Sequence, residues 1–282
     1  TADQNIGIGT YALHDTTSGY YNIAVGLNAG ANITTGFSNI AIGIGALQDL
    51  TTSNTNVAIG QNSGYKTTSG ENTFVGAYSG RYNTTASYSA ALGYQALQGV
   101  SSGSTGTSNV ALGPQTLESY TTGSNNTAVG RAAGDAITTG SNNTIIGYNA
   151  AASSATVSNE ITLGNSNISS LRCQVQTISS LSDARDKTNV APLQAGLDFV
   201  ERLDPVSFTW NMRDGGKVGI EETGFIAQDL QQVQQDTGVE IPGLVSVNNP
   251  ERLEAAYGRL VPVLVQAIKD LSAKVNELEA RI

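Results

Sequence analysis

Ser182 and Lys187 are the residues whose types and spacing could do chemistry in this chain. A serine hydroxyl becomes a nucleophile when a neighbouring base accepts its proton, and a lysine amine that has lost its own proton is such a base. In a continuous helix the two side chains would lie about 140° apart around the axis. We therefore expect a turn between them, or a partner chain that supplies one member. The alternative interpretation is a polar turn in which Asp183 caps a short helix.

The charged neighbours of this pair act in opposite directions. Arg185 places a positive charge nearby, which favours the loss of a proton from the lysine. Asp183 and Asp186 would oppose that loss if either carboxylate paired with Lys187. The sequence leaves both outcomes open.

Charge and composition divide the 282-residue chain into two parts. Residues 1–170 contain seven acids and three bases among many Gly, Ser, Thr, Asn and Ala residues, whereas residues 171–282 contain sixteen acids and eleven bases. A segment so poor in large apolar residues must share its buried surface between repeats or between chains. The net charge of −9, without a cluster of Lys or Arg among aromatic residues, argues against nucleic acid as a partner.

The scarcity of cysteine and histidine excludes several classes of site. Cys173 is the only cysteine and His14 the only histidine, so one chain has neither a disulfide framework nor a Cys/His metal site. We interpret Cys173 as a small buried apolar residue and His14 as a solvent-facing loop residue rather than a metal ligand shared by three chains. No cofactor is indicated, and no run of eighteen apolar residues predicts membrane insertion. Because the chain begins almost inside a repeat, we expect a fragment that lacks its N-terminal region.

A five-residue unit, Asn-x-Ala-x-Gly, recurs ten times between residues 5 and 164. Its glycines are 17 residues apart, except for one interval of 16 and one of 20, where three residues are inserted between Gln98 and Thr107. Seventeen residues suffice for one coil of a β-solenoid with short strands and glycine corners. The sequence therefore predicts a mainly β rod of about ten 17-residue rungs over residues 1–168. The glycines are Gly9, Gly26, Gly43, Gly60, Gly76, Gly93, Gly113, Gly130, Gly147 and Gly164.

An asparagine column, four residues before the glycines, predicts an internal ladder of side-chain amides. In stacked rungs each amide would bond the next, which gives the column a structural role. Beside it, Ile23 and Val25 face one way and Ala24 the other, so both strand faces should be buried. We expect one face to fill the coil and the alanine face to pack against a neighbouring chain. The column comprises Asn5, Asn22, Asn39, Asn56, Asn72, Asn109, Asn126 and Asn143.

These repeats resemble the left-handed parallel β-roll of trimeric autotransporter adhesin heads, whose strands carry a similar asparagine, alanine, isoleucine and glycine pattern. The resemblance covers about 160 residues and implies a trimer. Tyrosines in the turns, and the loop from Gln98 to Thr107, would offer contacts to a glycan, although surface tyrosines in turns are commoner than sugar sites. These tyrosines are Tyr20, Tyr21, Tyr78, Tyr82 and Tyr88.

Residues 169–181 form a connector between the repeats and the charged second part. Leu171, Cys173 and Val175 alternate there with polar residues, as in a strand.

Residues 182–282 are predicted to be an α+β domain. Apolar residues at helical spacing indicate a helix from Leu193 to Leu203, which Asp204 and Pro205 would end. The further predicted elements are a strand over Val206–Trp210, a polar turn at Asp214–Gly216, a strand entering a helix between Gly224 and about Gln235, and a short connection at Pro242–Val245.

The last segment, residues 257–282, has the heptad pattern of a coiled coil. Its apolar residues alternate in steps of three and four up to the final residue, which favours a seam between chains over packing against the chain's own domain. β-Branched residues at a with leucine at d locally favour two strands over three. The seam residues are Val261, Leu264, Ile268, Leu271, Val275, Leu278 and Ile282.

Four features in one order resemble the intramolecular chaperone domain of phage endosialidases and tail spikes. They are the Ser182–Lys187 stretch, the segment Asp204–Trp210, the segment Gly224–Leu230 and the terminal heptads. The resemblance spans about 100 residues. It implies a module that assembles three chains, helps the preceding β-structured fibre fold in register, and then cleaves itself off.

The resemblance also implies roles for single residues. By position Ser182 is the nucleophile of a self-cleaving serine endopeptidase, Lys187 is its base, and the bond between Leu181 and Ser182 is cut. Asp183 and Arg185 belong to the same motif and are expected to orient the pair.

We therefore predict a homotrimeric fibre, of a phage tail on the virion or of a bacterial cell surface, that attaches to a glycan or protein receptor. Near-identical repeats slip in register easily, and a trimerising module would align them. Its later removal would make the assembled fibre kinetically hard to unfold. One alternative is an uncleaved structural spacer and trimerisation module. The other, a glycan-degrading enzyme, needs two carboxylates about 5 to 10 Å apart, which seven scattered acids on the rod do not suggest.

Overall fold

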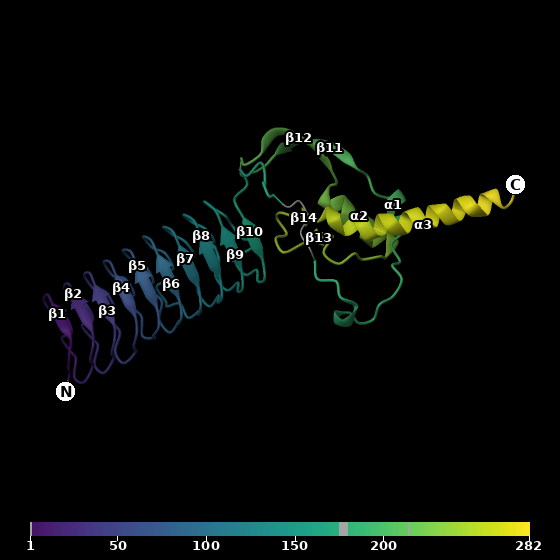
Figure 1. Ribbon diagram of the computed structural model, residues 1–282. Coiled ribbons are helices and arrows are strands. Elements are labelled where there is room, and N and C mark those ends of the chain that lie inside the picture. The colour runs from purple at the N-terminus through teal and green to yellow at the C-terminus, as the bar shows by residue number, and fades with distance from the viewer. Residues whose placement is uncertain (1, 175–179, 214) are drawn as a thin grey trace. The chain divides into compact units, whose positions relative to one another are not determined.

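A computed structural model describes residues 2–174, 180–213 and 215–282 of the chain. It divides into two compact units, Thr1–Asn167 and Ile168–Ile282, and each is described by itself (Figure 1). Among the described residues no helix combines the length and the apolar character needed to cross a membrane.

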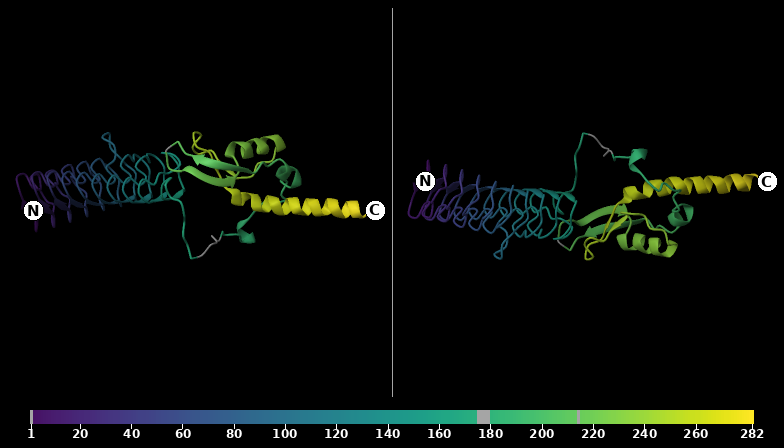
Figure 2. Two further views of the ribbon diagram at one scale, coloured as in Figure 1. Left: turned by 90° about the horizontal axis from the view of Figure 1, so that it is seen from above. Right: turned by 90° about the horizontal axis from the view of Figure 1, so that it is seen from below.

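The first unit is a β-solenoid in which ten short strands form one parallel sheet in sequence order (Figures 1 and 2). Neighbouring strands pair one repeat apart, so that Ala24 lies beside Ala41 and Ala41 beside Ala58. The predicted solenoid of 17-residue repeats is confirmed. The strands are β1 (Ile6–Ile8), β2 (Ile23–Val25), β3 (Ile40–Ile42), β4 (Val57–Ile59), β5 (Thr73–Val75), β6 (Ala90–Leu92), β7 (Val110–Leu112), β8 (Thr127–Val129), β9 (Thr144–Ile146) and β10 (Ile161–Leu163).

The glycine that ends each strand is required by the close stacking of the coils. Gly43 has a φ of 131°, and a Cβ there would lie 2.5 Å from the carbonyl oxygen of Gly60 in the next coil. Any side chain would therefore both strain this backbone and push the two coils apart.

The asparagine ladder lies inside the rod, as predicted. The Asn39 amide donates to Asn22 Oδ1 at 3.1 Å and to the Ser53 carbonyl oxygen at 3.0 Å. Its own Oδ1 accepts from the backbone N–H and the side-chain amide of Asn56, at 3.0 and 3.1 Å. In the tenth coil Glu160 takes the asparagine position, and its backbone N–H donates to Asn143 Oδ1 at 3.0 Å. The column thus satisfies buried backbone groups from coil to coil.

The alanine at the centre of most strands fills the interior of its own coil, so the expectation that it faces a neighbouring chain is wrong. Ala24 and Ala58 are fully buried, together with Ile33 and Leu50 from the opposite side of the coils. A coil of 17 residues encloses a narrow core, which in most coils holds a small side chain at the strand, although Phe74 of β5 and Ile145 of β9 are fully buried at the same position. The branched aliphatic residues on either side therefore point outward.

No strand forms over residues 169–174 and 180–181, where we expected the connector strand. The prediction that Cys173 is buried is also wrong, because this residue is exposed, as is Leu171. A strand needs partners for its backbone N–H and C=O groups, and no described strand pairs with this segment. Val175 belongs to residues 175–179, which lie outside the described residues.

The second unit combines helices with two small antiparallel sheets, β11 with β12 and β13 with β14. Most predicted elements are present, although the helix expected from Leu193 to Leu203 begins only at Leu197, and Leu193 is exposed. Asp214 of the predicted turn lies outside the described residues. The elements are α1 (Leu197–Glu201), β11 (Val206–Asn211), β12 (Val218–Gly224), α2 (Ala227–Thr237), β13 (Val245–Ser246), β14 (Glu254–Ala255), α3 (Leu260–Glu279), and the 3₁₀ turns η1 (Ala184–Asp186) and η2 (Tyr257–Arg259).

A polar contact explains why α1 starts late. The Leu197 backbone N–H donates to Asp270 Oδ2 at 3.0 Å, and the Gln266 amide donates to Asp270 Oδ1 at 2.8 Å. A Cβ on Gly196 would lie 2.1 Å from that Oδ2, so glycine is required where the chain turns into the helix. The start of α1 is thus fixed by α3, a contact between residues far apart in the sequence.

The core of this unit uses only one face of α3. Leu260 and Val263 pack with Phe199, Leu230 and Leu244 from the rest of the unit. The remaining apolar residues of the helix lie outside this cluster.

We expect the substitution Asn39→Ala to destabilise the rod by about 3 kcal/mol, because it leaves several buried hydrogen-bonding groups without partners. The midpoint of thermal unfolding, followed by circular dichroism, measures this. Asn32→Ala is the matched control, since that side chain is only half-buried and lies outside the ladder. Equal midpoints for the two variants would contradict a structural role for the column.

Candidate active site

The Ser182–Lys187 stretch folds into one tight turn built around η1. Asp183 caps it, since its Oδ1 accepts from the Arg185 backbone N–H at 2.9 Å. The Asp186 N–H then bonds the Asp183 carbonyl oxygen, and the Lys187 N–H bonds that of Ala184, both at 3.2 Å. The cap that we considered as an alternative interpretation is therefore present, and it belongs to the turn that we expected between serine and lysine.

This turn brings the two candidate side chains together. Lys187 Nζ lies 2.6 Å from Ser182 Oγ and 3.1 Å from the Ser182 carbonyl oxygen, so the lysine contacts two atoms of the same residue. A nucleophile and its base require this hydrogen-bonding distance.

Arg185 and Asp183 form a separate ion pair within the same turn. Arg185 Nε donates to Asp183 Oδ1 at 3.0 Å and to Oδ2 at 3.2 Å, and Nη2 donates to Oδ2 at 2.6 Å. These bonds lower the pKa of the Asp183 carboxyl below its ordinary value and raise the pKa of Arg185. The Asp183 carboxylate is thus held by Arg185 and not by Lys187.

No described residue of the second unit covers this site. Leu181 is 99% exposed, and the side chains of Ser182 and Lys187 are also in contact with water. The turn therefore supplies the distance between nucleophile and base but not a dry environment.

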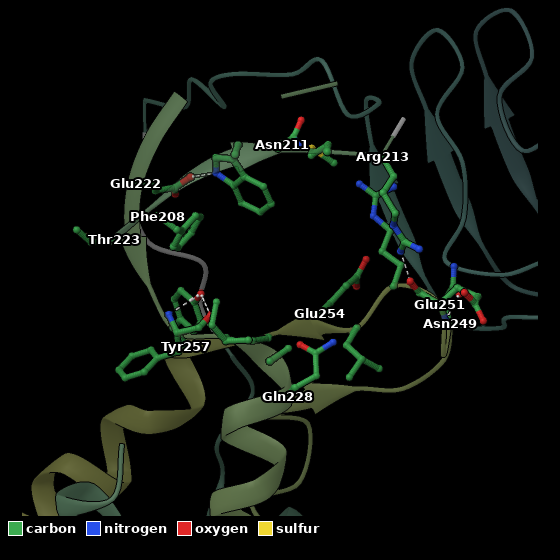
Figure 3. Close-up of a pocket in the computed structure, with 18 residues that line it drawn as sticks. Phe208, Asn211, Arg213, Glu222, Thr223, Gln228, Asn249, Glu251, Glu254 and Tyr257 are labelled. Carbon is green, nitrogen blue, oxygen red and sulfur yellow. Dashed lines mark hydrogen bonds between the residues drawn. The ribbon is translucent and has the colours of Figure 1, made fainter. Parts of the chain in front are cut away.

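A cavity of about 860 Å³ lies elsewhere in the second unit (Figure 3). The β11–β12 hairpin, the start of α2 and the segment around β14 surround it. Trp210 Nε1 donates to Glu222 Oε2 at 2.5 Å across the hairpin, and Lys217 Nζ lies 5.2 Å from the centre of the Trp210 ring. The sequence predicted the strand over Val206–Trp210 but not the cavity, because the cavity depends on contacts between distant segments.

A row of apolar side chains on α3 is uncovered in the single chain. Ile268 is 67% and Leu271 is 51% exposed, and these residues share one side of the helix. The other predicted seam positions are also exposed, namely Val261, Leu264, Val275, Leu278 and Ile282.

Among the described residues there is no group of three His, Cys, Asp or Glu side chains that could hold a metal ion. His14 is exposed, as we expected of a loop residue, and its Nδ1 lies 2.6 Å from Asp15 Oδ1.

Comparison with known families places the turn at the edge of a recognised domain. Residues 182–239 match the family described as chaperone of endosialidase. This segment is a chaperone of endosialidase domain. It begins at Ser182 and includes η1, α1, β11, β12 and α2, so the candidate pair lies at its start.

Two curated relatives match over 101 residues, which is 36% of this chain, at 36% identity. They are the proteins described as Long tail fiber protein Gp37 of Enterobacteria phage K3 and of Enterobacteria phage T2. The match covers 8% of the first relative and 7% of the second. No solved structure matched the chain significantly.

We expect the substitution Arg185→Ala to raise the pKa of Asp183 toward that of a free aspartate, because the arginine hydrogen bonds favour the carboxylate. The ion pair contributes to the stability of the turn above the ordinary aspartate pKa, and that contribution is lost as the pH falls through the lowered one. Carboxyl NMR with selectively labelled aspartate measures both values. Arg202→Ala is the control, since Arg202 pairs with Asp198 instead. An unchanged Asp183 titration in Arg185→Ala would rule out this pairing in solution.

Proposed function

We propose that residues 182–282 form a trimerising chaperone module that cuts its own chain once, between Leu181 and Ser182. The rod before it is then part of a phage tail fibre that attaches the virion to a cell. The observation that carries this proposal is the pairing of Ser182 with Lys187 at 2.6 Å at the start of a chaperone of endosialidase domain.

The cut proceeds in two balanced steps. Ser182 Oγ attacks the carbonyl carbon of Leu181 while Lys187 accepts the hydroxyl proton. The C–N bond breaks, the lysine returns that proton to the departing Ser182 nitrogen, and Leu181 is left as an ester on Oγ. Water hydrolyses the ester to a Leu181 carboxylate and restores the Ser182 hydroxyl, so the reaction consumes one peptide bond and one water molecule.

Assembly supplies the environment that the turn lacks. A lysine acts as a base after its amine has been withdrawn from water or placed beside a positive charge. Arg185 is already neutralised by Asp183, and the site is exposed in the single chain. A neighbouring chain that covers the turn would remove water from Lys187, so that cutting follows assembly.

Uncovered apolar surface on both units supports a trimer. On α3 the heptad positions form one such surface. On the rod, the last strand residue is Ile, Val or Leu in every coil, and Ile42, Ile59 and Leu112 at this position are each more than one-third exposed. Burial of both surfaces against two further copies of the chain would add buried apolar area that the thin rod lacks as a single chain.

The tail-fibre assignment is supported by the two relatives described as long tail fiber proteins. A receptor on the cell surface, whether glycan or protein, and a location on the virion follow from that assignment. The alternative is an uncleaved spacer and trimerisation module, which the exposure of Ser182 and Lys187 in the single chain favours.

Freshly expressed protein should contain a fragment that begins at Ser182, detectable by intact-mass spectrometry. Ser182→Ala and Lys187→Ala should each abolish the fragment, because one removes the nucleophile and the other its base. Thr188→Ala, just after the turn, should still be cut. Full-length chain in all four proteins would support the uncleaved spacer.

The uncleaved Ser182→Ala protein should have the mass of three chains in multi-angle light scattering. Leu271→Asp should reduce it to smaller species, because three carboxylates would meet in the seam, whereas Ala273→Asp on another side of α3 should not. A mass of two chains would mean that the local heptad preference decides the oligomeric state.

A further inference from the structure

One corner of the rod carries a run of long side chains in its middle coils. This corner consists of the fifth and sixth residues after each strand glycine. The coils on either side of these place small residues there, such as Ala31, Ala136 and Ala152, and the first coil carries His14 and Asp15. The coils between them carry aromatic, amide and charged residues instead, namely Gln48, Asp49, Tyr65, Lys66, Arg81, Tyr82, Gln98 and Glu118.

Arg81 is held at this corner by aromatic rings. Its guanidinium carbon lies 4.8 Å from the centre of the Tyr82 ring and 5.1 Å from that of Tyr78. Tyr78 in turn meets the half-exposed Tyr94 edge to face, with ring centres 5.9 Å apart. Stacking against the rings orders the guanidinium and leaves its Nη1 and Nη2 groups available as hydrogen-bond donors.

The charges of these coils leave Arg81 available to an anion. The rod has three basic residues, and Lys66 pairs with Asp49 at 3.2 Å. Arg81 has no carboxylate within salt-bridge distance in the described part of the chain, and its Nε is buried without a hydrogen-bond partner. An arginine that is ordered and yet unpaired is suited to a ligand that brings its own negative charge.

The three inserted residues of the rod lie next to the same corner. The Tyr82 N–H donates to the Gln98 carbonyl oxygen, and the Tyr82 carbonyl oxygen accepts from the Ser104 N–H, both at 2.8 Å. Between these bonds the chain leaves the coil as a loop, in which Ser101 and Ser102 are exposed (Figure 2). The loop therefore begins and ends at the backbone of Tyr82 and presents hydroxyl and peptide groups there.

We propose that this corner, defined by Tyr78, Arg81, Tyr82, Tyr94 and the loop Val100–Gly103, binds an oligosaccharide with a carboxylate or phosphate group. The inference rests on the proposed attachment function and gives the receptor a chemical class. Tyrosine rings stack on the apolar faces of sugars, the arginine fork binds the anionic group through two parallel bonds, and the loop supplies polar contacts. Tyr20, Tyr21 and Tyr88, which we also considered as glycan contacts, lie in other turns without a nearby unpaired arginine.

Calorimetry with the whole protein tests this site. The probes are an oligomer of galacturonic acid, a phosphorylated mannose oligosaccharide, and a neutral maltooligosaccharide of equal length. At least one anionic probe should bind. The probe that binds shows whether the site recognises a carboxylate or a phosphate group. Arg81→Gln should weaken that binding about tenfold or more, and Arg81→Lys should restore only part of it, because lysine keeps the charge but not the fork.

Arg131→Gln is the matched control, because that guanidinium lies over Tyr148 at 5.8 Å on a later coil, away from the loop. It should leave affinity within about twofold of the wild type, and thermal unfolding should show that all variants fold. Removal of Ser101–Gly103 should weaken binding while the coils stay intact. Equal affinity of Arg81→Gln and wild type, binding of the neutral probe alone, or binding of none of the probes would overturn the proposal.

The failure of this site and the failure of the proposed function are distinguishable. If the wild type and Arg81→Gln adsorb equally to host cells, the attachment function stands and its receptor contacts another surface, such as a protein-binding one. If the anionic probe binds but no cell is adsorbed, the site stands and the attachment function fails. The cleavage reaction is read separately, by the mass of the chain.

Discussion

The narrow interior of a 17-residue coil is the constraint on which the rod depends. Most coils place alanine at the strand and an asparagine beside it, so the interior holds a small side chain there, a hydrogen-bonded amide column, and larger residues such as Ile33 and Leu50 elsewhere in the coil. Asn39 bonds to both the backbone and the side chain of Asn56 in the next coil, which satisfies buried polar groups that water cannot reach. The branched aliphatic residues that do not fit inside are left on the outer face. The same constraint thus makes one coil stack well on another and leaves the stack with an apolar stripe.

The second unit meets a related constraint by a different route. Its two-stranded sheets are too small to be stable without further packing, and its core relies on helices gathered around Phe199 and Leu244. Helix α3 gives that core one side and leaves its heptad side uncovered. In the proposed trimer, both units would therefore bury surface that a single chain exposes, and folding of the rod and association of the helix would stabilise the same assembly.

Periodicity made most of the rod predictable, because a repeat that recurs ten times reports its own spacing and its internal column. Periodicity alone did not give the orientation of the strand. Alternation tells only that Ala24 and Val25 point in opposite directions, and the size of the enclosed core decides which one is inside. In the second unit, local patterns located β11 and α2. The start of α1 depends on Asp270 of α3, and the cavity depends on β14, which are long-range contacts that local spacing does not encode.

The Ser182–Lys187 turn separates two requirements of catalysis that are often met together. Its geometry is local, since an aspartate cap and one 3₁₀ turn suffice to bring Nζ to Oγ. Its environment is not local, because exposed side chains lose water only when something else packs on them. For the proposed cleavage, the distance between nucleophile and base would be set before assembly, and the environment that the chemistry needs would be completed only after it. That order suits a reaction that removes a folding module, since a cut made before the rungs are aligned would leave unaligned chains without the means to correct themselves.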